Sequence, residues 1–186
     1  MTQPGCNRWD YLSEMTQRHT ITEINTLAQD QFALIFGPVF EASPWIAEAA
    51  WAARPFAGLE ALHQAMCAVV ERAGQERQLA LIRAHPDLAG RLAQAGRLTQ
   101  ASTGEQAAAG LDRLTPEETG RFTKLNAEYL DRFGFPFVIC ARLNKKDAIL
   151  EAFGRRLKHT PAEEIKTALD EIGKIAELRL RDLIAT

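Results

Sequence analysis

The sequence predicts a compact all-α protein, a single-domain bundle of about eight helices with one buried extended segment. Three observations lead to this prediction. Apolar residues recur at helical spacing, helix-start signatures of the Ser/Thr-x-x-Glu type recur, and the alternating pattern of half-buried strands is absent. The chain has 186 residues, 46% of them hydrophobic, which is enough for one full-sized core. We expect a poorly ordered leader over residues 1–20 and one helical domain over residues 21–186.

Caps and prolines mark the first helices. Thr20, three residues before a glutamate, predicts the start of a helix that Gly37 ends. Ser43 as an N-cap, with a proline directly after it, predicts a second helix that stops before Pro55. A third, amphipathic helix should lie between two glycines, over residues 58–74.

The centre of the chain has two ionisable groups at predicted helix junctions. An apolar helix should stop near His85, because Pro86 disfavours helical geometry at the residue before it. Ser102 is expected to be an N-cap with Glu105 three residues on, and the stretch between the two junctions could form a short helix. The imidazole and the carboxylate could then face each other across a cleft. Taken singly, each also has a purely structural explanation, as a residue before proline and as a capping residue.

The second half of the chain contains the predicted buried segment. A long amphipathic helix should start at Thr115 and end at Gly134. The apolar run 133–143 is rich in aromatic and β-branched residues, so we expect it to be extended or irregular, and buried. Its backbone groups need partners, which a polar ligand, neighbouring helix ends or ordered water could supply. Helix should resume over residues 144–158, and a last helix should open at Thr160.

Composition excludes several classes of function. The net charge is −2 and the 22 basic residues are scattered, which argues against nucleic acid and against an anionic membrane surface as partner. No apolar run approaches the roughly 18 residues that cross a bilayer, so we expect a soluble, cytoplasmic protein. The cysteines, Cys6, Cys67 and Cys140, lie far apart without metal-ligand spacing, so no metal site is predicted and a reducing compartment is expected.

Four strings in the sequence resemble one known family. SPWIAEAAW, RAHPDLAG, SxxEQxxAGLDxL and FGFPFVICAR, in this order, are similar to motifs of the OHCU decarboxylase family, over about residues 25–183. Members of this family convert 2-oxo-4-hydroxy-4-carboxy-5-ureidoimidazoline (OHCU) to (S)-allantoin in urate degradation. The resemblance implies an all-helical fold, a small-molecule ureidoimidazoline substrate and a homodimer.

The resemblance also implies roles for particular residues. His85 would be the catalytic acid/base group, with Glu105 close to the chemistry. An arginine of the last helix would bind the ligand; Arg179 matches best, beside the apolar face, whereas its neighbour Arg181 should point towards solvent. The remaining implied substrate contacts are Pro86, Ser102, Gln106 and the backbone of Phe137, Val138, Ile139, Cys140 and Ala141.

Physical chemistry supports the implied reaction without a cofactor. The carboxylate that leaves is attached next to a C=N bond, which can take up the electron pair that pyridoxal or thiamine accepts in other decarboxylases. A histidine, with an ordinary pKa of about 6.5, can exchange protons near neutral pH. Two other functions use the same residue types: a non-catalytic helical binding module, and a ureide hydrolase in which His85 and Glu105 activate water.

Overall fold

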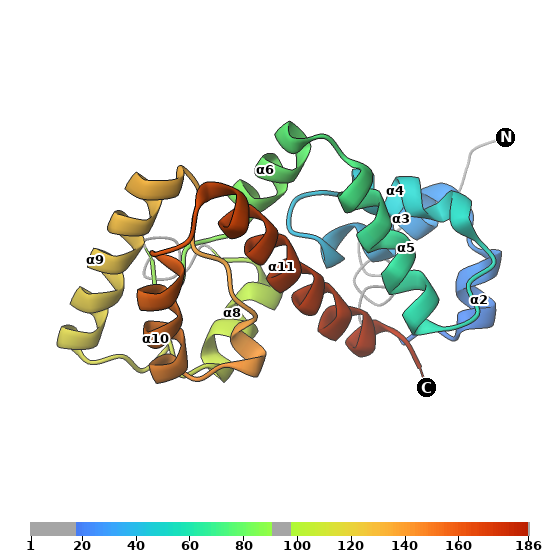
Figure 1. Cartoon of the computed structure of the whole chain (residues 1–186). Coiled ribbons are helices and arrows are strands. Elements are labelled where there is room, and N and C mark those ends of the chain that lie inside the picture. Colours follow the sequence, from blue (N-terminus) through green and yellow to red (C-terminus); the bar gives the residue numbers. More distant parts are fainter. Residues whose placement is uncertain (1–17, 91–97, 186) are drawn as a thin grey trace, which may run out of the picture. The chain divides into compact units, whose positions relative to one another are not determined.

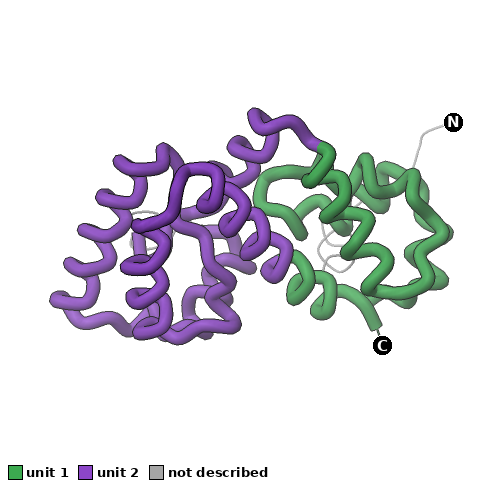
Figure 2. The backbone as a smooth tube through the Cα atoms, in the orientation of Figure 1, with its two compact units in different colours: residues 1–72, 176–186 green, residues 73–175 purple. Residues whose placement is uncertain are grey.

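The computed structural model describes residues 18–90 and 98–185 (Figure 1). Within these ranges it contains nine α-helices and three short 3-10 helices, and its β-structure is limited to one isolated bridge. The all-α prediction is therefore confirmed. The chain divides into two compact units, unit 1 with residues 1–72 and 176–186, and unit 2 with residues 73–175 (Figure 2). Most of the predicted leader, and most of the short helix predicted between the central junctions, lie outside the described residues.

Unit 1 packs its helices around an aromatic and aliphatic core. Helix α4 packs against both α3 and α5. Side chains with no exposed surface form the centre of this core: Phe32, Phe36, Ile46, Leu62 and Met66. The elements are α2 (Ile21–Thr26), α3 (Gln29–Phe36), η1 (Gly37–Val39), α4 (Trp45–Ala50), η2 (Trp51–Ala53) and α5 (Leu59–Arg72).

Two sequence predictions for unit 1 were wrong in detail. The helix predicted from Thr20 to Gly37 is broken after α2, because the Leu27 carbonyl accepts hydrogen bonds from Trp51 Nε1 at 3.0 Å and from Arg54 Nη1 at 2.7 Å. These side chains replace the helical partner of that carbonyl. Ser43 is not an N-cap either, since α4 begins two residues later, with a proline in the cap position.

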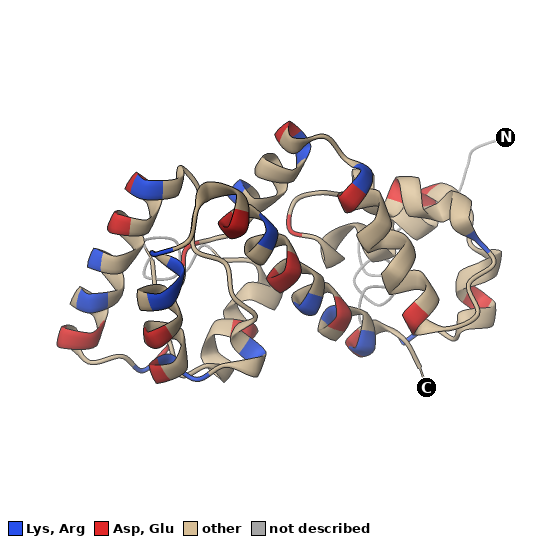
Figure 3. Ribbon diagram, in the orientation of Figure 1, with Lys and Arg blue, Asp and Glu red and all other residues tan. Residues whose placement is uncertain are grey.

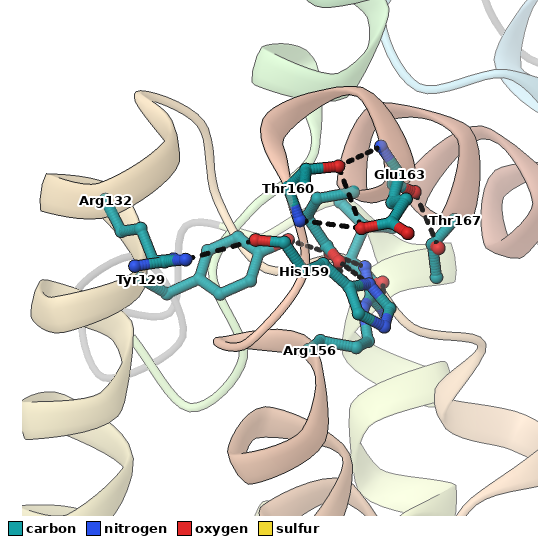
Figure 4. A network of polar contacts seen from close by, with 9 residues as sticks. Tyr129, Arg132, Arg156, His159, Thr160, Glu163 and Thr167 are labelled. Carbon is teal, nitrogen blue, oxygen red and sulfur yellow. Dashed lines mark hydrogen bonds and ion pairs between the residues drawn. The ribbon is translucent and has the colours of Figure 1, made fainter.

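Unit 2 contains the longer helices. The elements of unit 2 are α6 (Gln75–Ala84), α8 (Gln100–Ala108), α9 (Pro116–Phe133), η3 (Ala141–Leu143), α10 (Lys146–Arg156) and α11 (Pro161–Leu183). The part of α11 from Ala176 onward belongs to unit 1. The predicted capping box of Thr115 at the start of α9 is confirmed, and Gly134 ends this helix with a left-handed φ of 74°. At α11 the Thr160 N–H donates to Glu163 Oε2 at 2.8 Å, in the same kind of box (Figure 4). Helix α10 is shorter by two residues at each end than the predicted range 144–158.

The two ends of the described part of unit 1 are hydrogen-bonded to each other. The His19 N–H donates to the Leu183 carbonyl at 2.8 Å, and the Ala185 N–H donates to the His19 carbonyl at 2.9 Å. Residues 18–20, at the end of the predicted leader, are thus attached to the end of α11.

Charged residues of both signs are distributed along the same helices. Basic and acidic residues are interspersed along α9 and α11 (Figure 3). Of the helices in the described ranges, none combines the length and the apolar character that a membrane span requires.

Candidate active site

His85 occupies the end of α6, as the sequence predicts. Helix α6 ends at Ala84 and His85 is its C-cap, with an extended ψ of 138° ahead of Pro86. The imidazole is buried, with 6% of the residue surface exposed. Its Nδ1 lies 2.9 Å from the carbonyl oxygen of Leu81. Because a carbonyl only accepts hydrogen bonds, this contact places a proton on Nδ1, and the neutral ring then carries its lone pair on the buried Nε2.

The loop that follows His85 is fastened to two helices of unit 2. The Ala89 N–H donates to Oε1 of Gln106 on α8 at 3.0 Å, and Asn126 on α9 donates to the Leu88 carbonyl at 2.8 Å. Ala89 has a left-handed φ of 50°, a conformation that costs a non-glycine residue free energy and persists where neighbouring contacts enforce it. The loop carrying His85 therefore has a defined conformation.

Helix α8 begins earlier than predicted. Its N-cap is Thr99, whose hydroxyl oxygen accepts from the Ser102 N–H at 3.2 Å, so the prediction of Ser102 as N-cap was wrong. The threonine thus caps the helix three residues sooner than predicted. Glu105 consequently lies in the second turn, where no helix start needs a capping carboxylate. The structural explanation of Glu105 as a capping residue is thereby removed.

Glu105 and the buried segment approach each other within unit 2. Helix α8 packs against η3, directly after the segment. Burial raises the pKa of the Cys140 thiol, and the negative charges of Glu171 and Glu105 raise it further. The residue Cys140 is 1% exposed. Helix α8, which carries Glu105, thus lies beside the end of the segment.

The predicted buried segment is confirmed over residues 135–141, which have no regular structure before η3. The prediction was too long at both ends, because Phe133 still belongs to α9 and Leu143 is 61% exposed. Side chains supply partners for part of the segment's backbone. Arg156 Nη1 donates to the Val138 carbonyl at 2.7 Å, and the Cys140 N–H donates to Glu171 Oε2 at 2.8 Å.

The two candidate arginines differ in their surroundings. Arg179, in the unit 1 part of α11, is 7% exposed and its Nη1 donates to Glu41 Oε2 at 3.0 Å. Arg181 is exposed and pairs with Glu177 one turn earlier, at 2.6 Å. Arg179 is therefore the buried and fixed arginine, as its position beside the apolar face predicted.

Sequence reasoning missed several hydrogen-bond partners of the candidate residues. Glu41 precedes the SPW string without any periodic signal, and the pairing of Gln106 with Ala89 has no local signature. Arg156 and Glu171 could have been suspected only because they are charged residues at positions that face the interior of the helical bundle. Among the residues that the structure describes, no group of three or more His, Cys, Asp or Glu side chains has the arrangement of a metal site.

Comparisons with known proteins identify the family of the chain. A family model described as OHCU decarboxylase matches residues 25–181. The 2-oxo-4-hydroxy-4-carboxy-5-ureidoimidazoline decarboxylase of Haloferax volcanii is 45% identical over 88% of this chain and 95% of its own length. The enzyme of the same name from Mus musculus is 42% identical over 88% of this chain and 92% of its own.

Solved structures share the fold. A crystal structure of (S)-allantoin synthase has a TM-score of 0.71 and 31% identity over 90% of this chain, which spans only 54% of that longer chain. An OHCU decarboxylase solved in the presence of (S)-allantoin has a TM-score of 0.64 at 24% identity, over 80% of this chain and 96% of its own, and supports the fold alone. The fold and the comparisons define an all-helical carboxy-lyase. More particularly, the chain belongs to the OHCU decarboxylase family.

Proposed function

We propose that this chain decarboxylates OHCU to (S)-allantoin in urate degradation. The observation that supports this most is the similarity to curated decarboxylases over more than nine-tenths of their length, at 45% identity for the Haloferax volcanii enzyme. The local geometry of His85, Glu105 and the segment 135–141 fits the chemistry that such a reaction needs.

His85 is proposed as the acid/base group, acting through Nε2. The Leu81 carbonyl holds the proton of Nδ1, so Nε2 is the nitrogen that can take a proton from the substrate. Burial of the ring keeps competing water away from this nitrogen. General acid/base help of this kind contributes typically about 10²- to 10⁴-fold to the rate.

The reaction proceeds with the substrate as its own electron sink. The bond between the ring carbon and the carboxylate breaks, CO₂ leaves, and the electron pair moves through the adjacent C=N bond onto nitrogen, which takes a proton. The resulting enol loses its hydroxyl proton and gains a proton on the other ring carbon, giving allantoin. His85 is proposed to accept the hydroxyl proton. No cofactor is needed in this scheme, because the electron pair never leaves the substrate.

The other predicted residues would bind and orient the ring. Glu105 is proposed to accept from the ureido N–H groups, with Ser102, Gln106 and the Pro86 backbone contributing further contacts from the same part of unit 2. The backbone of residues 137–141 would supply donors and acceptors. Arg179 remains in the proposal as the cation that holds a ring oxygen or a developing oxyanion, which is supported by its burial and by the fixed orientation that Glu41 gives it.

The stereochemistry of the product tests this function. Spontaneous decay of the substrate should protonate the planar intermediate from both faces and give racemic allantoin. We expect chelated and desalted protein, mixed with freshly generated OHCU, to give (S)-allantoin alone, as followed by optical activity. Racemic product at the spontaneous rate would reject the decarboxylase proposal. Activity that disappears on chelation and returns with metal would reject the cofactor-free scheme.

The role of His85 is tested by His85→Asn. This change keeps a polar side chain of similar size but removes proton exchange, so turnover should fall by about 10²- to 10⁴-fold while the circular dichroism spectrum stays unchanged. His63→Asn, on α5 of unit 1, is the matched control and should retain activity. A folded His85→Asn protein with wild-type turnover would return His85 to a purely structural role at the helix end.

A cytoplasmic homodimer completes the proposal. Cys67 and Cys140 are free thiols in the structure, which suits a reducing compartment. The dimer rests on the resemblance to the family, and sedimentation of the purified full chain at several concentrations measures it directly. A single species at the monomer mass of 20.7 kDa would reject it.

A further inference from the structure

The buried segment is held by a polar network that the proposed chemistry does not use. At its centre is Glu164 of α11, which has no exposed surface. Its Oε1 accepts from Arg156 Nε at 2.7 Å and Nη2 at 2.5 Å, and also from the Tyr129 hydroxyl. Its Oε2 lies 2.7 Å from His159 Nδ1. Figure 4 shows Tyr129, Arg156 and His159, which come from different parts of the chain, close together.

The network fixes the orientation of the Arg156 guanidinium. Burial, and then the hydrogen bond to Glu164, raise the pKa of Tyr129, so its hydroxyl stays protonated and continues to donate. The Glu164 carboxylate accepts hydrogen bonds from two nitrogens of the Arg156 guanidinium. Because the guanidinium is planar, its third nitrogen can then point in only one direction. That nitrogen, Nη1, donates to the Val138 carbonyl at 2.7 Å. The guanidinium also lies 4.3 Å from the centre of the Phe137 ring.

A second side chain holds the next peptide along the segment. Glu171 Oε2 accepts from the Cys140 N–H at 2.8 Å. The carbonyl of Val138 shares its peptide plane with the Ile139 N–H, and the Cys140 N–H shares its plane with the Ile139 carbonyl. In a trans peptide the N–H and C=O point in opposite directions. Fixing one partner of each plane therefore directs the Ile139 N–H away from Arg156 and the Ile139 carbonyl away from Glu171.

Ile139 is thus the residue whose backbone is oriented from both sides. It is 7% exposed, and within the described ranges no hydrogen bond is formed by its N–H or its carbonyl. A buried donor and a buried acceptor on one residue match a ring or ureido amide, which offers one acceptor and one donor.

We propose that Arg156, oriented by Glu164, and Glu171 are positioning residues that aim the Ile139 N–H and carbonyl at the amide groups of the substrate. This inference rests on the proposed function, because it assigns the segment to the substrate of that reaction. Neither side chain touches the reacting atoms. Both act through the peptide planes next to Ile139.

Glu171 gives the sharper test, because its side chain is 12% exposed and is not part of the Glu164 network. Glu171→Met removes the acceptor of the Cys140 N–H, whereas Glu171→Gln keeps an acceptor at the same length. Lys174→Met removes only the ammonium that pairs with Glu171 at 2.5 Å and is the matched control. We expect kcat/KM to fall by about 10- to 100-fold in Glu171→Met and to stay near wild type in the other two, since small misplacements of binding groups cost rates of this order.

A spectroscopic measurement separates positioning from stability. In the full-length wild-type protein, titration with (S)-allantoin should shift the amide signal of Ile139. In Glu171→Met this shift should be lost, although the circular dichroism spectrum and the other amide signals remain those of the folded wild-type protein. Arg156→Lys, which keeps a charge for Glu164 but cannot also reach the Val138 carbonyl, should behave in the same way.

The outcomes distinguish the two levels of the proposal. Racemic product at the spontaneous rate with the wild-type protein would reject the proposed function itself. An active wild-type protein together with a folded Glu171→Met of unchanged kcat/KM would reject only the positioning role. If both variants fail to fold, the wild-type titration decides: an Ile139 amide signal that does not respond to (S)-allantoin would overturn the inference, and a specific response would support it.

Discussion

The hydrogen bond between Gln106 and Ala89 allows a quantitative prediction. Gln106→Met keeps the length of a side chain that is 6% exposed but removes the Oε1 acceptor that lies 3.0 Å from the Ala89 nitrogen. Removing the acceptor of a buried N–H costs about 1–3 kcal/mol. For a chain of this size each kcal/mol lowers the midpoint of thermal unfolding by about 2–4 °C, so a decrease of about 2–12 °C is expected.

The assay compares chemical and thermal unfolding of Gln106→Met with Gln100→Met. Gln100 is exposed at the start of the same helix, and its replacement should change the free energy of unfolding by no more than about 0.5 kcal/mol. Turnover should also fall in Gln106→Met, because the loop that it holds begins at His85. Equal stability of the two variants would refute the reasoning that this hydrogen bond fixes the loop.

Two further predictions concern the loop and a helix start. A Cβ at Gly90 would lie 2.1 Å from the Asp87 carboxylate, so Gly90→Ala should lower the free energy of unfolding by about 1–3 kcal/mol. Gly104, in the middle of α8, has open space around it, so Gly104→Ala should raise the free energy of unfolding by about 0.5–1 kcal/mol. Urea unfolding measures both changes. The pKa of Glu163 is lowered below 4.5, mainly by the hydrogen bond that its carboxylate accepts from the Thr160 N–H. The stability that the Glu163 carboxylate contributes is therefore present above pH 4.5 and is lost as the pH falls through the lowered pKa. Glu163→Gln should therefore flatten the fall of the thermal midpoint in acid, and an unchanged acid dependence would contradict the role of this carboxylate.

The predictable part of the fold is the part that local chemistry determines. The capping box at Thr115 and the left-handed Gly134 involve neighbours in sequence, so their signals are readable directly. The break at Leu27 depends on Trp51 and Arg54, more than twenty residues away, and no periodicity reports it. Helix existence was thus predictable from the sequence, whereas tertiary hydrogen bonds decided where two of the helices in unit 1 end and begin.

The candidate site likewise has features that follow from neighbouring residues and features that depend on distant ones. His85 at a helix end and the burial of residues 135–141 follow from Pro86 and from an unbroken apolar run. The start of α8 was misplaced because Thr99 and Ser102 are both good caps, and sequence alone does not choose between two hydroxyls three residues apart. Partners such as Glu41 for Arg179 come from distant positions and required the structure.

The hydrogen bond from His85 to Leu81 has a consequence for how the imidazole is prepared. In a continuing helix the Leu81 carbonyl would accept from the backbone N–H four residues later, which is the N–H of His85 itself. That N–H instead bonds to Ile82 at 3.2 Å, and the side chain of the same residue takes the place it left, at 2.9 Å. The ring thus imitates one more helical turn and obtains its tautomer from the way the helix ends. Pro86 disfavours helical geometry at His85 and so keeps the backbone and the side chain from competing for a single oxygen. A residue with no titratable group thus decides which nitrogen of the imidazole is left for the proposed proton transfer.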